Sequence, residues 1–92
     1  MTDPLAALRA RFRDRALADR ETLEVLAREN PAGDELRRLV HNLAGTAGTF
    51  GYGRLSEAAA EIDDQMASGL PADSASLDRL KDRLAEAAQA SS

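Results

Sequence analysis

The chain has 92 residues, a formal net charge of −4 from 16 acidic and 12 basic residues, no cysteine and a single histidine. This length fits one small domain, residues 1–92, and the lack of cysteine excludes disulfides and thiolate metal sites. A net acidic chain with two phenylalanines and one tyrosine also lacks the clustered cations and the stacking surfaces of a general nucleic-acid binder.

The N-terminal third is predicted to be helical. Asp3 followed by Pro4 is a helix start signal, and apolar residues recur at helical spacing from Leu5 onward. We predict a short helix over about 4–18 and a second over about 19–29, capped by Asp19, unless the two are continuous. No signal-peptide pattern or apolar run of about 18 residues is present, so we expect a cytoplasmic protein without a membrane span.

The next predicted helix carries the only histidine, His41. Asn30-Pro31-Ala32-Gly33 is a stop signal, Asp34 is expected to cap the new helix, and the glycines at 48–53 are expected to end it. At about 100° per residue, five apolar side chains fall within roughly 40° of one line and form a buried stripe, with Leu39 at its edge: Leu36, Val40, Leu43, Ala47 and Phe50.

Two further helices complete the predicted fold. Apolar residues from Leu55 to Met66 mark one helix that ends near 69–71, and Asp73, Ser74 or Ser76 can cap the last. The serine-rich tail, 90–92, is expected to fray. Helices that are apolar on one face and joined by short loops pack antiparallel around one core. The predicted fold is therefore all-α, an up-down antiparallel four-helix bundle with an additional short N-terminal helix.

His41 lies about 140° from the buried stripe, on the solvent side of its helix. Gly45 and Gly48 lie on the same side, one and two turns further on, and each costs roughly 1 kcal/mol against alanine. A lone histidine on a helix most often has no special role. Two glycines beside it, however, indicate a bare platform on which another molecule can reach the ring.

Most chemistries that use histidine lack their other parts here. A structural metal site needs several ligands, and there is no second histidine and no cysteine. A Gly-x-Ser-x-Gly elbow is missing, and the glycines at 45–53 lack the strand and the Gly-Lys-Ser/Thr ending of a phosphate loop. One role does need a solitary exposed histidine, namely carrying a phosphoryl group between partners that supply the metal and the acidic groups.

The segment 41–62 resembles the histidine-containing phosphotransfer (HPt) domain of multistep phosphorelays. The resemblance rests on His41-x-Leu43-x-Gly45, on Gly51 ten positions after the histidine, and on Leu55 four positions beyond. It implies a monomeric phosphocarrier, not an enzyme in its own right, that has no cofactor of its own. His41 would take a phosphoryl group from an aspartate of one response-regulator receiver domain, which holds Mg²⁺, and pass it to another, with a hybrid histidine kinase upstream.

The resemblance assigns roles to the residues around His41. Gly45 matches the small residue that lets the receiver approach, and Gly51 the glycine that closes the helix. Ala44 departs from the lysine that many members carry near the phosphoryl group. Arg37 and Arg38, a turn before His41, are the candidates to replace that charge; the alternative is a solvated helix face.

For some of the other residues, two alternative roles are open. Asp63 matches a position where some relatives place a carboxylate or an amide that orients the imidazole, and plain surface charge is the alternative. Together with Arg37 and Arg38, Arg54 is a candidate to steer an acidic receiver toward the site. Phe50 and Tyr52 are assigned to packing. Three apolar residues either pack, which we favour, or present a docking patch beside His41: Leu5, Leu8 and Phe12.

Two rival functions remain open. The first is a non-phosphorylated adaptor that binds or inhibits a histidine kinase or a receiver, and Ala44 gives it weight. The second is the dimerising helical domain of a histidine kinase, although the phosphoacceptor of that family is usually followed by an acidic residue and His41 is followed by Asn42. The start at Met1 and the serine end favour a free protein over a piece excised from a kinase.

Overall fold

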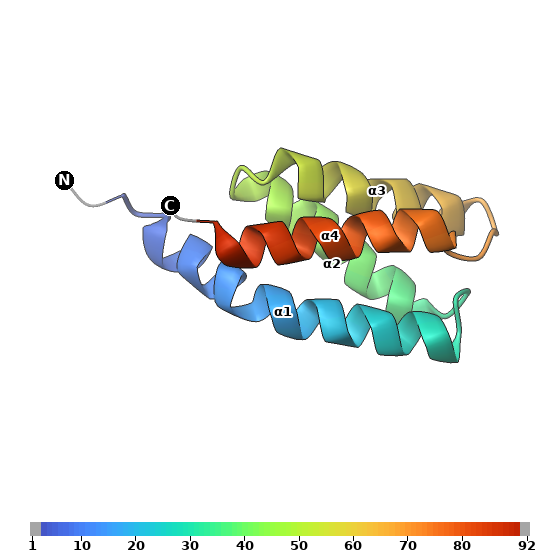
Figure 1. The fold of residues 1–92 in the computed structure, drawn as a ribbon. Helices are drawn as coiled ribbons and strands as arrows, with labels where there is room; N and C mark the ends of the chain where they lie inside the picture. The colour runs from blue at the N-terminus through green and yellow to red at the C-terminus, as the bar shows by residue number, and fades with distance from the viewer. Residues whose placement is uncertain (1–2, 91–92) are drawn as a thin grey trace.

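The computed structural model describes residues 3–90 as four α-helices joined by short loops. Their bounds are Ala6–Glu29 for α1, Asp34–Thr49 for α2, Gly53–Ala67 for α3 and Ser74–Gln89 for α4. The helices alternate in direction, and the start of α1 lies at the same end of the bundle as the end of α4 (Figure 1). The predicted all-α, up-down antiparallel bundle is confirmed for these residues.

The additional short N-terminal helix is not a separate element in the described part of the chain. The two expected helices form one helix, α1, of 24 residues. Asp3 acts at its start, because its Oδ1 accepts a hydrogen bond from the backbone N–H of Leu5 at 2.9 Å. Asp19 is not a cap but lies half-buried within α1. The helix continues across the expected boundary at 18–19, because no glycine or proline interrupts the chain there.

Two glycines with positive φ follow the C-terminal ends of α2 and α3. Gly51 follows α2 with φ of 87° and Gly69 follows α3 with φ of 86°. Beyond each glycine, a backbone N–H reaches back to a carbonyl five residues earlier, from Tyr52 to Ala47 at 2.8 Å and from Leu70 to Gln65 at 3.1 Å. This left-handed closure favours glycine, because a Cβ at such φ values is strained.

The helix N-termini are capped in different ways. Asp73 caps α4 as predicted, because its Oδ2 accepts a hydrogen bond from Ser76 N–H at 3.0 Å. The expected cap at Asp34 is wrong, since Gly33 occupies the cap position without a side-chain bond and Asp34 is the first residue of α2. Its carboxylate still stabilises α2, because the positive end of the helix dipole favours negative charge in the first turn.

One hydrophobic core runs through the bundle, with all four helices contributing. Each helix contacts two neighbours, and α2 packs most closely on α3 and least closely on α1. The larger apolar side chains with less than 2% exposure are these: Leu23, Leu36, Val40, Ile62, Leu80 and Leu84. The described part of the chain has no helix long and apolar enough to cross a bilayer.

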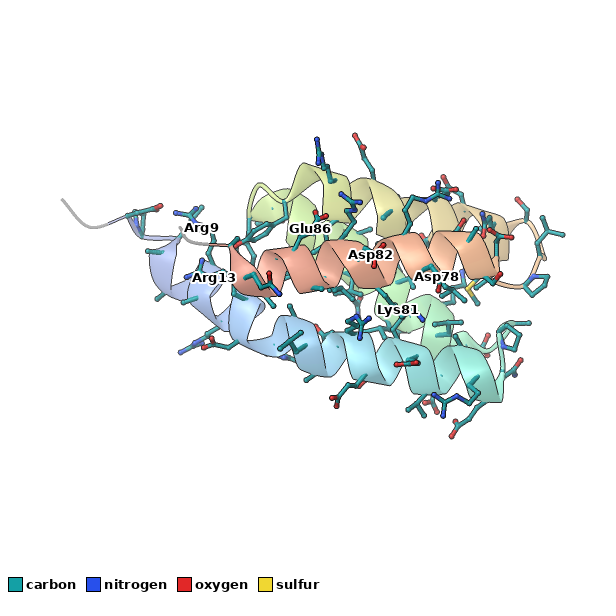
Figure 2. All side chains as sticks on the ribbon, viewed as in Figure 1. Arg9, Arg13, Asp78, Lys81, Asp82 and Glu86 are labelled. Atoms are coloured by element: carbon teal, nitrogen blue, oxygen red, sulfur yellow. The ribbon has the colours of Figure 1, made fainter. Side chains whose placement is uncertain are left out.

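The outer surface of α1 and α4 carries charges of both signs. Figure 2 shows Arg9 and Arg13 projecting from α1 and four charged residues on the adjacent helix α4: Asp78, Lys81, Asp82 and Glu86. Part of this charge is neutralised locally, because Lys81 Nζ lies 3.3 Å from Asp78 Oδ1. Such exposed pairs contribute little to stability, about 0–1 kcal/mol each.

Candidate functional site

His41 lies in the middle of α2 with 72% of its side chain exposed. The opposite side of the helix is the predicted apolar stripe, where four residues are buried and Phe50 is half-buried: Leu36, Val40, Leu43 and Ala47. The helical periodicity therefore predicted correctly both the core side of α2 and the exposure of the imidazole.

Asp63, from α3, reaches the histidine ring. Its Oδ2 lies 3.0 Å from His41 Nδ1, and the carboxyl group is only 20% exposed. A carboxylate can only accept, so this hydrogen bond requires a proton on Nδ1, and in the neutral ring Nε2 then keeps its lone pair. The other oxygen, Oδ1, lies 3.6 Å from Arg37 Nε. The structure thus brings together three of the residues that the sequence assigned to the site, and it places Asp63 between Arg37 and His41.

The two glycines of the predicted platform differ in their surroundings. A Cβ added to Gly45 would meet no heavy atom within 4 Å, whereas one added to Gly48 would lie 3.3 Å from Ser56 Oγ. Ser56 in turn donates from Oγ to the carbonyl of Ala44 at 2.8 Å. Gly45 therefore forms the open surface beside His41, while Gly48 lets α3 approach α2.

The candidate cations lie in different places. Ala44 is half-buried against the core and adds no charge near the ring. Arg38 is exposed, and the described residues include no ion-pair partner for it. Arg54 does not line the hollow at His41 but a depression between α3 and α4, together with Arg83. Of the three predicted steering residues, only Arg37 and Arg38 share a helix with His41.

The ring of His41 lines one hollow, and a second hollow adjoins the first. A shallow depression of about 430 Å³ is lined by His41, Gly45 and four further residues: Asn42, Thr46, Thr49 and Phe50. A groove of about 410 Å³ between α1 and α2 shares three of these residues, Asn42, Thr46 and Phe50. The rest of the groove is lined by the following: Leu8, Arg11, Phe12, Arg15, Asp19, Leu39 and Leu43. We name this feature the α1–α2 groove.

The α1–α2 groove is apolar at its base and charged at its rim. Phe12 is buried, Leu8 is 42% exposed and Leu5 is 37% exposed. Burial raises the pKa of Asp19 above its ordinary value, and the charge of nearby Arg15 acts in the opposite direction. The predicted packing role of Phe12 is confirmed, while Leu5 and Leu8 keep much of their apolar surface open.

An aromatic cluster fixes the floor next to the site. The Phe12 ring lies edge-on to Phe50 with centroids 6.1 Å apart, and it stacks on Tyr52 at 5.1 Å. These pairs tie the loop between α2 and α3 to α1, and aromatic contacts of this kind stabilise by about 0.5–1.5 kcal/mol beyond their buried area. The predicted packing role of Phe50 and Tyr52 is confirmed.

Several lining residues were absent from the sequence prediction. Asn42, Thr46 and Thr49 border the depression, and Thr49 Oγ1 donates to the carbonyl of Gly45 at 3.0 Å. Spacing would have indicated Thr49, which lies eight positions after His41 on the same side of α2, but not Asn42 or Thr46. Ser56 lies on another helix, and no local pattern pointed to it.

No group of three histidine, cysteine or carboxylate side chains able to hold a metal ion occurs among residues 3–90. A model of the Hpt domain family matches residues 7–90, nearly the whole chain. Comparison with curated proteins and with solved structures gives no match. The family match covers all four helices, and thus extends well beyond the motif around His41.

Proposed function

Because the chain belongs to the Hpt domain family, whose members carry phosphoryl groups on histidine in phosphorelays, we propose that it is a phosphohistidine carrier between receiver domains and a hybrid histidine kinase. The observation that carries this proposal is the environment of His41. Its ring is 72% exposed, hydrogen-bonded at Nδ1 and bordered by the open surface of Gly45.

The proposed transfer uses Nε2 of His41. The Nε2 lone pair attacks the phosphorus of a receiver aspartyl phosphate, a P–N bond forms, and the P–O bond to the aspartate breaks with its electron pair going to the aspartate carboxylate. The imidazole gains positive charge as the P–N bond forms, and the Asp63 carboxylate at Nδ1 stabilises that charge. Donation of the phosphoryl group to a second receiver is the reverse of this step.

The surface around the ring suits a transient partner. The depression at His41 and the α1–α2 groove adjoin, so a receiver that brings its aspartate to the ring would cover both. The exposed apolar surface of Leu5 and Leu8 would contribute to docking. Mg²⁺ and the acidic groups belong to the receiver in this proposal. Arg38, which has no ion-pair partner among residues 3–90, supplies a cation on the same helix as His41.

Phosphotransfer from a panel of phosphorylated receiver domains with Mg²⁺ tests the proposal, using wild type, His41→Ala and His41→Gln. We expect acid-labile, base-stable label on wild type alone, with unchanged helical content in both variants because His41 makes no core contact. Label on either variant would refute the assignment of His41. Sedimentation should report a monomer, whereas a dimer would favour the kinase dimerisation domain.

A non-phosphorylated adaptor remains the second candidate, because Ala44 leaves the phosphoryl position without the lysine that many members carry. An adaptor would bind receivers equally well with and without His41. Absence of label from every donor, with receiver binding intact in wild type and His41→Ala, would favour this function.

A further inference from the structure

Asp63 links two side chains of α2 from the neighbouring helix α3. Its Oδ2 accepts from His41 Nδ1 at 3.0 Å, and its Oδ1 faces Arg37 Nε at 3.6 Å. Arg37 and His41 are separated by one helical turn, so their side chains share one side of α2. The carboxyl group is 20% exposed, against 51% for Arg37 and 72% for His41. The least exposed member of the three therefore lies in the middle.

The two carboxyl oxygens of Asp63 depend on different partners. Oδ1 is buried and forms no hydrogen bond among the described residues, which leaves the ion pair with Arg37 as its stabilising contact. A buried polar oxygen without any partner is costly. Loss of the guanidinium would therefore allow the carboxyl group to rotate or to move toward water, and either movement would disturb the Oδ2 bond to His41.

We propose that Arg37 is a positioning residue that acts on His41 through Asp63, and not a direct ligand of the phosphoryl group. This inference rests on the proposed phosphoacceptor role of His41. Arg37 fixes Oδ1, the fixed carboxylate holds the Nδ1 proton, and the ring presents Nε2 to the solvent. The guanidinium is engaged on the Nδ1 side of the ring, where the carboxylate lies, and the phosphoryl group would arrive at Nε2.

The test compares Arg37→Gln with Arg79→Gln as a matched control. Arg79 also pairs with a carboxylate of α3, Glu61, at 3.4 Å, and it is 53% exposed, but it belongs to α4 and its ion pair does not involve α2. Each variant is made in the wild-type and in the Asp63→Ala background. The first readout is the ¹⁵N shifts of the His41 ring in the unphosphorylated protein, which report the tautomer. The second is the rate of phosphorylation by phosphoramidate, a small donor that needs no partner domain.

We expect Arg37→Gln to lower the Nδ1–H tautomer population and to slow phosphorylation about two- to fivefold, the range that corresponds to an exposed ion pair. Arg37→Lys should restore part of the tautomer population and part of the phosphorylation rate. Arg79→Gln should change neither quantity. In the Asp63→Ala background, Arg37→Gln should have no further effect.

Unchanged ring shifts in Arg37→Gln would overturn the inference. A rate loss that persists in the Asp63→Ala background would also overturn it, because Arg37 would then act on the phosphoryl group directly. The tautomer readout needs no phosphorylation. A wild-type protein that takes no label would therefore refute the proposed carrier function, while a tautomer change in Arg37→Gln would still support the coupling.

Discussion

Gly45 offers a test in which stability and transfer should change in opposite directions. A helix-interior glycine costs roughly 1 kcal/mol against alanine, and a Cβ added here meets no heavy atom within 4 Å. Gly45→Ala should therefore stabilise the bundle by up to about 1 kcal/mol, which raises Tm by about 4–8 °C in a domain of this size. Gly48→Ala should gain less, because its Cβ would lie 3.3 Å from Ser56 Oγ, a hydroxyl that already bonds to Ala44.

Larger side chains at Gly45 should block the partner while still favouring the helix. Gly45→Leu places bulk over the depression at His41, and Gly45→Glu adds a carboxylate that would face an acidic receiver. Like charges brought together at an interface cost several kcal/mol, so Gly45→Glu should slow transfer at least about tenfold. Thermal unfolding by circular dichroism and label transfer from a receiver are measured on the same samples. Equal transfer rates in wild type and Gly45→Glu would refute the proposal that the receiver approaches His41 over Gly45. A lower Tm in Gly45→Ala would refute the conclusion that the space beside Gly45 is open.

Three further predictions concern the scaffold. Burial raises the pKa of Asp19 in the folded state above its ordinary value of 3.8. The protonated carboxyl group therefore stabilises the fold below pH 3.8, and this stabilisation is lost as pH rises through the folded pKa. In urea titrations Asp19→Asn should be more stable than wild type at pH 7, and the difference should vanish in acid. Leu84 is 0% exposed, so Leu84→Ala should lower the free energy of unfolding by about 2–5 kcal/mol. Leu17 is 56% exposed, so Leu17→Ala should change the free energy of unfolding by no more than about 0.5 kcal/mol. Ser76 is 2% exposed and its hydroxyl bonds to Gln65 at 3.1 Å, so Ser76→Ala should cost about 1–3 kcal/mol by chemical denaturation; no loss would show that its partners find water instead.

The helical class, the core side of α2 and the exposure of His41 follow from the amino-acid sequence alone. These follow from the 3.6-residue period, which is a local property, because the apolar stripe must face the core and the opposite side must then face water. The stop signal at 30–33 was also predictable, and the cap of α4 was narrowed to Asp73, Ser74 or Ser76, since proline, glycine and capping side chains act within a few residues. The motif around His41 likewise predicted the family that the match over residues 7–90 shows.

The contacts that form between neighbouring helices could not be predicted from the pattern along the chain. Asp63 is 22 positions from His41 in the chain, and only the packing of α3 on α2 brings its carboxylate to the ring between His41 and Arg37. The same packing separates Gly45, which faces open space, from Gly48, which faces Ser56, although both glycines have the same local cost in a helix. Interhelical register sets these contacts, and register depends on how complete side chains fit across a core, which the pattern along one helix does not specify.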